Sequence, residues 1–387
     1  MRRAIQRRMA CAVLATLMGT PAMADEAMRA AVDAVVEPLM AEHGVPGLSV
    51  AVLHDGERHV FHYGVASRET GVTVGDETLF EIGSLSKPFT GTLLARLEAE
   101  GAVDLSSEAQ NMLPALAESP IGGASLLELL TYAAGGLPLQ FPDGVNETNF
   151  AEFYRDFEPI DEIGVSRLYS NPSIGLAGHL AAAGAGDSFS SLMADRIFEP
   201  LGLTDTFLAV PEDRLDDYAQ GYTRDNAAVR VNPGLFDEEA YGIKTTASDF
   251  LRFVEASIDP AGLDADLQAG LSKARNGVYR VDAMHQGLGW ELYGAPARLD
   301  DLLQGADTAF VLEPNRVERP ASPVTGDAVG AVSKTGSTGG FGAYALFQPE
   351  RGTAIVLLAN RFWPNPARIE AAHAILAAID PDFVMQQ

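Results

Sequence analysis

Both ends of the chain carry a helical pattern together with apolar strand patterns, and this constrains the fold more than any other feature. Near the N-terminus, a helical pattern of valine and leucine over residues 32–39 precedes two apolar runs, residues 48–53 and 58–63, joined at Asp55-Gly56. The last third has three strand patterns and a closing helix, at residues 330–335, 340–347, 353–358 and 366–379. We therefore predict one sheet assembled from both ends of the chain.

The middle of the chain has mainly helical patterns. Ser125-Leu126-Leu127-Glu128 is a capping box that opens a helix over residues 126–132. Further helices are expected around the aromatic stripe at residues 150–157 and at residues 171–183, 188–198 and 248–257.

These patterns predict an α/β (α+β) fold, with an antiparallel sheet from both chain ends flanked by helices and an inserted, mainly helical lobe. The α/β lobe would comprise residues 25–80 and 205–387, and the helical lobe residues 81–204. The cleft between the two lobes is the expected place for a site.

The first 24 residues resemble a secretory signal peptide. Four arginines, at positions 2, 3, 7 and 8, precede the apolar run 9–18, and Ala22-Met23-Ala24 supplies a small-residue cleavage pattern. The apolar run is too short to span a bilayer. We therefore expect a periplasmic protein without a membrane partner after cleavage. The single Cys11 lies inside this segment, so the mature chain would have neither a thiol nor a disulfide.

The chain is strongly acidic, with a formal net charge of −26. Loss of the four N-terminal arginines would make the mature chain more negative still. Nucleic acid is therefore not an expected partner. The acidity fits a solvation device in a salty medium as well as it fits neutral compositional drift, and it does not identify a substrate.

Ser84 and Lys87 form the first chemically informative pair. A helix over residues 84–100, ended by Gly101, would place the Lys87 ammonium beside the Ser84 hydroxyl and the helix N-terminus beside both. Pro88 should tighten the first turn, because it has no N–H and disfavours the α conformation at the residue before it. Ser-x-x-Lys is a short pattern, and alone it is more often structural than catalytic.

Two further patterns supply the partners that this pair needs. Tyr169-Ser170-Asn171 would present a phenol that can move protons and an amide that can bind a carbonyl group. In Lys334-Thr335-Gly336, at the end of a predicted strand, we expect a positive field, a hydroxyl for a carboxylate, and room for a ligand at Gly336. Each pattern alone would be an ordinary loop or strand end, but the three together, in this order, rarely arise by chance.

With these motifs the chain resembles the class C β-lactamases of the serine β-lactamase and penicillin-binding superfamily. The resemblance covers nearly all of the mature chain, and it is densest in the segments 79–84, 134–140, 239–242, 286–291, 334–342 and 364–368. It implies a serine β-lactamase/DD-peptidase-like fold and the hydrolysis of β-lactam antibiotics, most often cephalosporins, with no metal or other cofactor. We expect a monomer whose partner is a small-molecule β-lactam.

The resemblance also implies roles for individual residues. Ser84 would be the acylated nucleophile, Lys87 its base or proton relay, and Tyr169 the group that activates Ser84 and later the water. The remaining residues would bind the substrate. The side-chain amide of the substrate would be held by Gln140 and Asn171, and Tyr241 would wall the pocket for that side chain. The carboxylate end would be held by Lys334, Thr335, Gly336 and Asn365. The oxyanion hole would be formed by the N–H groups of Ser84 and Ser337.

The physical chemistry supports the same role for Tyr169. A tyrosine between two lysines should have its pKa lowered from about 10, because both cations stabilise the phenolate. Two positions depart from the family pattern: Phe362 stands where many members have asparagine, and Ser333 where many have histidine. These departures concern the substrate profile more than the reaction.

Other reactions have less support. The chain has no Gly-x-Ser-x-Gly elbow, and its seven histidines lack paired metal spacing. A D-Ala-D-Ala carboxypeptidase or an esterase on the same fold would share Ser84, Lys87 and Tyr169. A non-catalytic binder of cell-wall fragments would be expected to have lost part of this set, and none of it is missing.

Overall fold

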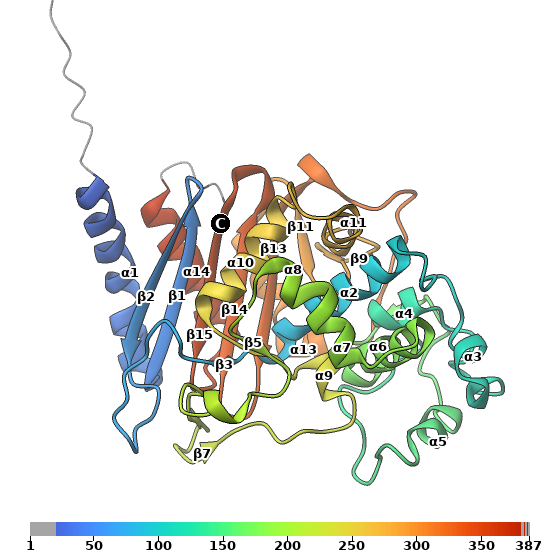
Figure 1. Ribbon diagram of the computed structural model, residues 1–387. Coiled ribbons are helices and arrows are strands. Elements are labelled where there is room, and N and C mark those ends of the chain that lie inside the picture. The colour runs from blue at the N-terminus through green and yellow to red at the C-terminus, as the bar shows by residue number, and fades with distance from the viewer. Residues whose placement is uncertain (1–20, 381–382, 384, 386–387) are drawn as a thin grey trace, which may run out of the picture.

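The computed structural model describes residues 21–380, 383 and 385, and its centre is an eight-stranded sheet (Figure 1). Its strand order is β2-β1-β15-β14-β13-β11-β10-β9, and every neighbouring pair is antiparallel. The strands are β1 (Gly47–His54), β2 (Glu57–Gly64), β9 (Tyr279–Val281), β10 (Met284–Gln286), β11 (Glu291–Gly294), β13 (Val329–Ser337), β14 (Gly342–Gln348) and β15 (Thr353–Ala359). The prediction of one antiparallel sheet built from both chain ends is confirmed.

The pairing of β1 with β15 joins the two ends of the chain. Leu48 lies opposite Ala359 and Leu53 opposite Ala354. The β1–β2 hairpin turns at Asp55 and Gly56, both with positive φ, as the Asp-Gly pair predicted. Every residue of β14 and β15 is buried, because helices cover both faces of the sheet.

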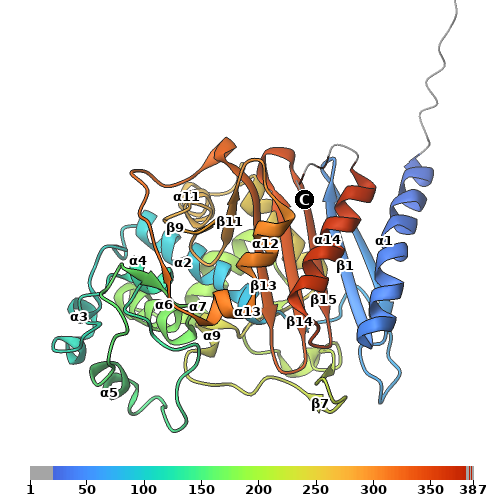
Figure 2. The same ribbon diagram turned by 180° about the vertical axis from the view of Figure 1, so that it is seen from behind.

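Three helices cover one face of the sheet, as Figure 2 shows: α1 (Pro21–His43), α12 (Leu299–Gly305) and α14 (Asn365–Ile379). On the other face, α10 (Ala247–Ile258) packs on β1 and β15.

The predicted signal peptide falls almost entirely on residues 1–20, outside the described part, together with Cys11. Its predicted cleavage point, after Ala24, lies in the first turns of α1. Among the described helices, none combines the length and the apolar character needed to cross a bilayer.

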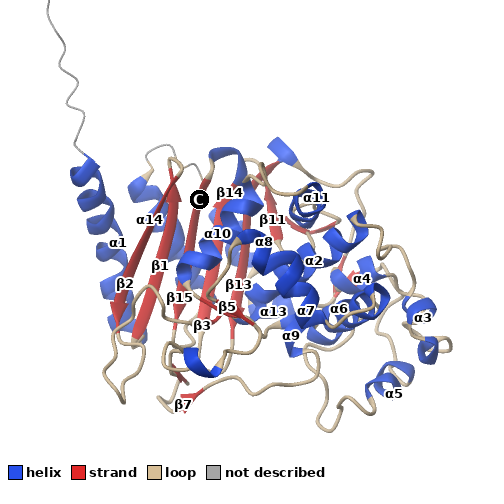
Figure 3. Ribbon diagram, viewed as in Figure 1, coloured by secondary structure: helices blue, strands red, loops and turns tan. Residues whose placement is uncertain are grey.

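The remaining helices mostly gather on the side of the sheet that lies to the right in Figure 3. They are α2 (Lys87–Ala99), α3 (Ala109–Met112), α4 (Leu126–Leu130), α5 (Phe150–Arg155), α6 (Asn171–Ala185), α7 (Phe189–Met193), α8 (Glu199–Leu201), α9 (Asp237–Ala240), α11 (Ala265–Ala274) and α13 (Thr308–Leu312). Of these, α8 packs against α10. The capping box of α4 forms as predicted, with Ser125 and Glu128 each accepting from the other's backbone. The predicted helix 188–198 is α only to Met193 and continues as a π-helical turn over Ala194–Phe198.

Seven short strands of the described residues lie outside the main sheet. β3 (Phe80–Glu81), β8 (Lys244–Thr245) and β5 (Thr206–Phe207) form a three-stranded sheet just before Ser84. β4 (Ser166–Arg167) pairs with β12 (Asn315–Arg316), and β6 (Gly221–Tyr222) pairs with β7 (Ala228–Val229). α2 is the central helix: it packs against α11, α6 and α9, and eleven of its thirteen residues are buried.

Asn360, directly after β15, ties three separate segments together. Its side chain is fully buried, its Oδ1 accepts from the Gly47 amide at 2.7 Å, and its Nδ2 lies 3.0–3.1 Å from the carbonyl oxygens of Val65, Ala66 and Gln220. Each of these backbone groups would lose a buried partner if the side chain were removed.

We therefore predict that Asn360→Ala lowers the free energy of unfolding by about 2–4 kcal/mol, measured by urea denaturation. Asn111→Ala is the matched control, because Asn111 is exposed in α3 and should change stability by less than about 0.5 kcal/mol. Equal effects of the two substitutions would contradict the account of Asn360.

α9 holds a buried carboxyl group next to the site described below. Glu239 is only 6% exposed, and a side-chain carbon on Gly178 of α6 would come within 2.6 Å of the Glu239 side chain. Burial, with the nearby charges of Glu238 and Asp237, raises the pKa of Glu239 to about 8. Its backbone carbonyl accepts from the Thr90 hydroxyl at 2.6 Å, so α9 is fixed to α2.

The raised pKa of Glu239 predicts that the free energy of unfolding falls as the pH rises. A carboxyl group whose pKa is higher in the folded state stabilises that state fully below the unfolded pKa, and this stability is lost as the pH rises toward 8. Relative to Glu239→Gln, which stays neutral, the wild type should lose on the order of 3 kcal/mol of unfolding free energy between pH 5 and pH 9. A difference between the two proteins that does not change with pH would contradict the prediction.

Candidate active site

Ser84 lies in a short 3-10 turn, Gly83–Ser86, that leads directly into α2. The predicted α-helix from residue 84 is therefore wrong at its start, because the α-helical part begins at Lys87. Residues three apart eclipse each other in a 3-10 turn, so this geometry brings the Lys87 side chain onto Ser84. Pro88 fits as the second residue of α2, where an N–H has no intrahelical partner.

The end of β13 packs directly against this turn. Gly83 has a φ of +53°, and a side-chain carbon there would come within 2.5–2.6 Å of the Ser337 backbone. A side-chain carbon on Gly336 would meet the Ile82 carbonyl oxygen at 2.0 Å. The room that was expected at Gly336 for a ligand is therefore occupied by the Ser84 turn, and glycine is needed there for packing.

Lys87 is fully buried and its ammonium group has three acceptors. Nζ donates to Ser84 Oγ at 3.1 Å, to Asn171 Oδ1 at 2.6 Å and to the Ala240 carbonyl at 2.8 Å. These three bonds use all three donors of an ammonium group. Burial lowers the pKa of Lys87, and Lys334 lowers it further against the opposing effect of Tyr169.

Tyr169 lies between the two lysines. Lys87 Nζ is 5.0 Å and Lys334 Nζ 4.8 Å from the centre of its ring. The side chain is buried, and its hydroxyl oxygen has no hydrogen-bond partner of ordinary geometry among the described residues. The Ser170 hydroxyl caps α6 by accepting from the Ser173 amide at 3.0 Å, and Tyr169 immediately precedes this cap.

The surroundings of Tyr169 favour its anion. Burial raises its pKa, but Lys334, Lys87 and the Ser84 hydroxyl outweigh burial, so the pKa is lowered. The expected direction of this shift is confirmed. A phenol with a lowered pKa beside a serine hydroxyl can accept the proton of that hydroxyl.

Lys334 on β13 is paired with a carboxylate that the sequence analysis gave no role. Its Nζ donates to Glu291 Oε1 at 2.9 Å, and both side chains are buried. Burial lowers the pKa of Lys334, but Glu291 and Tyr169 outweigh burial, so the pKa is raised and the lysine stays charged. Glu291 lies opposite Ser333 in the β11–β13 pairing, which places it next to Lys334.

Arg167 is a second residue that the sequence analysis missed. It is fully buried, its Nε donates to Gln286 at 2.8 Å, its Nη2 lies 3.8 Å from Glu291, and its guanidinium is 5.5 Å from the Tyr169 ring centre. Its position two residues before Tyr169, on the same face of an extended segment, was the available sequence indication.

The last residues of β13 are held by a third missed residue, Arg368 of α14. Its Nη1 donates to the Gly336 carbonyl at 2.7 Å and to Ser337 Oγ at 2.9 Å. Burial lowers the pKa of Arg368 to about 9. Thr335 and Ser337 remain partly exposed at the strand end, where a ligand could reach them.

The other predicted binding residues surround this centre to different extents. The Asn171 side chain contacts Lys87, and the backbone N–H of Asn171 donates to the Leu139 carbonyl at 3.0 Å. The exposed Gln140 directly follows Leu139 in the chain. Tyr241 is half-buried and directly follows Ala240, the acceptor for Lys87.

Asn365 stands apart from this group. It is the first residue of α14, and its Nδ2 donates to the Ala306 carbonyl at 3.4 Å, while its Oδ1 is buried without a hydrogen-bond partner among the described residues. Within its segment it is Arg368, and not Asn365, that hydrogen-bonds the end of β13. The predicted role of Asn365 in binding a carboxylate remains a prediction.

An apolar cavity of about 470 Å³ opens beside Tyr169. Leu139, Phe153, Ile160 and Leu312 are among its lining residues. Ile160 is 58% and Leu312 46% exposed, which is unusual for large apolar side chains. A substrate could place an apolar substituent here.

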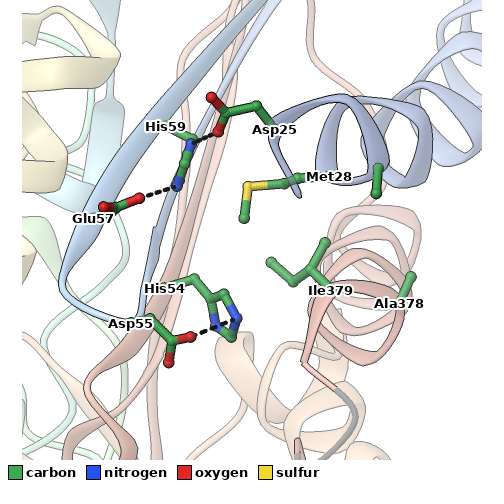
Figure 4. Close-up of a pocket in the computed structure, with 9 residues that line it drawn as sticks. Asp25, Met28, His54, Asp55, Glu57, His59, Ala378 and Ile379 are labelled. Atoms are coloured by element: carbon green, nitrogen blue, oxygen red, sulfur yellow. Dashed lines mark ion pairs between the residues drawn. The ribbon is translucent and has the colours of Figure 1, made fainter. Parts of the chain in front are cut away.

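A second cavity, of about 380 Å³, lies between the start of α1, the end of α14 and the β1–β2 turn (Figure 4). His54 and His59 lie on its wall, 3.6 Å from Asp55 and 3.4 Å from Asp25 respectively. None of the predicted site residues lines it.

Within residues 21–380 and the two described positions beyond, no group of three or more histidine, cysteine or acidic side chains is arranged to hold a metal ion.

Comparison with known proteins gives a consistent result. The family model "Beta-lactamase" matches residues 32–380. A β-lactamase of Pseudomonas fluorescens is 47% identical over 354 residues, which cover 91% of this chain and 99% of that protein. A β-lactamase of Escherichia coli K12 is 39% identical over 371 residues, covering 95% and 98%.

A solved structure supports the same relationship. The crystal structure of a β-lactamase/D-alanine carboxypeptidase from Pseudomonas syringae superposes with a TM-score of 0.88 at 39% identity, covering 91% of this chain and 99% of that one. Together with the serine, lysine and tyrosine brought together at one site, these matches show that the chain belongs to the β-lactamase family of serine hydrolases.

Proposed function

We propose that the protein is a class C β-lactamase that hydrolyses the β-lactam amide, with a preference for cephalosporins, through an acyl-enzyme on Ser84. The observation that carries this proposal is the position of Tyr169, buried between Lys87 and Lys334 and with a lowered pKa. Such a phenol can serve as the base twice in one turnover.

In the acylation step, the Tyr169 oxygen takes the proton from Ser84, and Ser84 Oγ forms a bond to the lactam carbonyl carbon. The Lys87 ammonium, 3.1 Å from Ser84 Oγ, stabilises the developing negative charge on that oxygen. The carbonyl oxygen becomes an oxyanion, for which the N–H groups of Ser84 and Ser337 are the proposed donors. The carbon–nitrogen bond then breaks, and the proton on Tyr169 passes to the departing nitrogen.

In the deacylation step, Tyr169 takes a proton from a water molecule, whose oxygen attacks the ester carbon. The bond between this carbon and Ser84 Oγ breaks, and the proton on Tyr169 passes to Ser84 Oγ. A phenol that is easily deprotonated suits this step, because water is a weak nucleophile at neutral pH. This second step separates an enzyme that destroys β-lactams from one that they inhibit.

Binding of the substrate follows from the remaining residues. Lys334 and Thr335 would face the substrate carboxylate, and Gln140 and Asn171 its side-chain amide. Tyr241 would wall the side-chain pocket. No step in this reaction requires a metal or another cofactor.

The signal-peptide pattern supports a periplasmic location, where the enzyme would confer resistance to β-lactam antibiotics as a monomer. The strongest alternative is a D-Ala-D-Ala carboxypeptidase, since the similar protein from P. syringae is named for both activities. An esterase would use the same three residues. A non-catalytic binder has less support, because such a protein would be expected to have lost part of this set of residues, and none of it is missing.

We predict that a slowly hydrolysed β-lactam acylates Ser84 alone, because this is the serine hydroxyl bonded to Lys87. Intact-mass spectrometry should show one adduct on the wild type and none on Ser84→Ala. Ser106, which is exposed and distant in sequence, provides the control, and Ser106→Ala should still acquire the adduct. An adduct that persists on Ser84→Ala would reject the assignment.

We predict that Tyr169→Phe lowers kcat for a cephalosporin by about 10²–10⁴, because the variant lacks the general base. Stopped-flow and steady-state kinetics should show little change in the initial binding of the substrate. Near-normal turnover in Tyr169→Phe would remove the role given to the phenol. A wild type that forms a stable acyl-enzyme after one stoichiometric burst would favour the carboxypeptidase alternative.

A further inference from the structure

Glu81 is a buried carboxylate that has no role in the mechanism above. It is the second residue of β3, it precedes Ser84 by three residues, and only 1% of its surface is exposed. A carboxylate in the protein interior needs hydrogen-bond donors, because its removal from water is costly. The donors that meet Glu81 therefore show which parts of the chain this carboxylate holds together.

Three donors from two other segments converge on Glu81. Its Oε1 accepts from the Tyr218 hydroxyl at 2.5 Å and from the Val231 backbone N–H at 2.8 Å. Its Oε2 accepts from the Thr338 hydroxyl at 2.5 Å. Hydrogen bonds to an ionised carboxylate are shorter and stronger than those between neutral groups. Glu81 thus joins β3 to the segment that contains β6 and β7 and to the residue that follows β13.

The bond to Thr338 extends a close backbone contact beside the nucleophile. A side-chain carbon on Gly83 would lie 2.6 Å from the backbone nitrogen of Ser337, so the turn that presents Ser84 packs against this nitrogen itself. Thr338 is the next residue of the chain, and its hydroxyl reaches Glu81 on the same segment as Gly83. The Ser337 nitrogen therefore lies between a packed backbone contact and a charged hydrogen bond.

The chain beyond Thr338 is poorly suited to hold this position by itself. Gly339 and Gly340 follow, and glycine has the greatest conformational freedom of all residues. The Thr338 N–H donates to the Phe341 carbonyl at 3.2 Å, which closes the turn around the two glycines. A fixed residue at the start of this turn is what keeps the end of β13 in one place, and the Thr338 hydroxyl supplies it through Glu81.

We propose that Glu81 is a positioning residue for the oxyanion hole, which acts through Thr338 to hold the Ser337 N–H where the oxyanion forms. This inference rests on the proposed function, and it names the group that sets the spacing between the two donors, the N–H groups of Ser84 and Ser337. Such donors act at about 2.7–3.1 Å from the oxyanion, so a small displacement of either donor weakens the stabilisation. Glu81 is linked to both donors, since it precedes one in the chain and binds the residue after the other.

The test measures the binding of phenylboronic acid, which imitates the tetrahedral intermediate. The Ser84 oxygen forms a bond to boron, the serine proton passes to Tyr169, and one boron hydroxyl takes the place of the oxyanion. In Thr338→Val, which keeps the shape but lacks the hydroxyl, the Kd should rise about tenfold, less than the factor of about 10²–10³ expected when an oxyanion donor is lost entirely. Thr338→Ser, which keeps the hydroxyl, should bind the boronic acid as the wild type does.

Binding of the intact substrate distinguishes positioning from a general structural effect. Calorimetry on Ser84→Ala should give a Kd for a cephalosporin that changes less than about twofold when Thr338→Val is added, because no oxyanion has formed in this complex. If Thr338→Val weakens the binding of the boronic acid and of the cephalosporin to the same extent, the proposal is overturned.

Glu81→Gln tests the carboxylate itself. An amide offers one acceptor oxygen where Glu81 offers two, so one of its donors loses its acceptor, and the Kd for phenylboronic acid should again rise about tenfold. The double variant with Thr338→Val should lose little more than either single variant, because both remove the same link. Losses that multiply would show that Glu81 does not act through Thr338. Should Glu81→Gln fail to fold, the comparison of Thr338→Val with Thr338→Ser decides.

Ser257→Ala is the matched control. Ser257 is fully buried in α10, and its hydroxyl donates to the Phe253 carbonyl at 2.9 Å within that helix. The variant should lower the melting temperature, as the loss of a buried hydrogen bond does, and leave the binding of phenylboronic acid unchanged. An equal rise of the Kd in Ser257→Ala and Thr338→Val would mean general loosening and would overturn the proposal.

Hydrolysis of p-nitrophenyl acetate separates this inference from the proposed function, because any acyl transfer to Ser84 passes through an oxyanion. If the wild type hydrolyses no β-lactam but Thr338→Val slows the hydrolysis of this ester about tenfold, the proposed function fails and the positioning role stands. If the wild type hydrolyses cephalosporins efficiently and Thr338→Val does so equally well, the proposed function stands and the positioning role fails.

Discussion

Tyr169 lies between two buried ammonium groups, and the contacts around them hold this arrangement in place. Removing two lysine side chains from water costs several kcal/mol for each unless their charges find partners. Lys87 meets this cost with three hydrogen bonds, and Lys334 with the Glu291 carboxylate. The two cations then lower the pKa of Tyr169 despite its burial.

The fold serves this arrangement by bringing three distant segments into contact. The 3-10 turn presents Ser84, the start of α6 presents Tyr169 and Asn171, and β13 presents Lys334. The Ser84 turn and the end of β13 approach so closely that a side chain would fit neither at Gly83 nor at Gly336. The site is therefore built on packed backbone, which keeps its geometry fixed.

Much of this could be predicted from the sequence, because the relevant patterns are local. The Asp55-Gly56 hairpin and the three C-terminal strands follow from short apolar runs separated by turn residues. The lowered pKa of Tyr169 followed from the expected proximity of two lysines. The capping box at Ser125 likewise fixed the start of α4.

Other features depend on contacts that no local pattern records. Glu291 reaches Lys334 only through the register of β11 against β13, and Arg368 reaches Ser337 from α14, which covers one face of the sheet. The turn at Ser84 is 3-10 and packs against β13, whereas helical spacing predicted an α-helix.

Tyr169 should ionise more easily than an ordinary tyrosine, and titration of Tyr169 itself measures this. With tyrosine labelled by ¹³C at the ring carbon bearing oxygen, NMR would follow the ten tyrosines, and Tyr169→Phe would identify the signal of interest. The account predicts a midpoint for Tyr169 below the ordinary value of about 10, and a rise in that midpoint when Lys334 is replaced by Met. A Tyr169 signal that stays neutral beyond pH 10 in the wild type would contradict it.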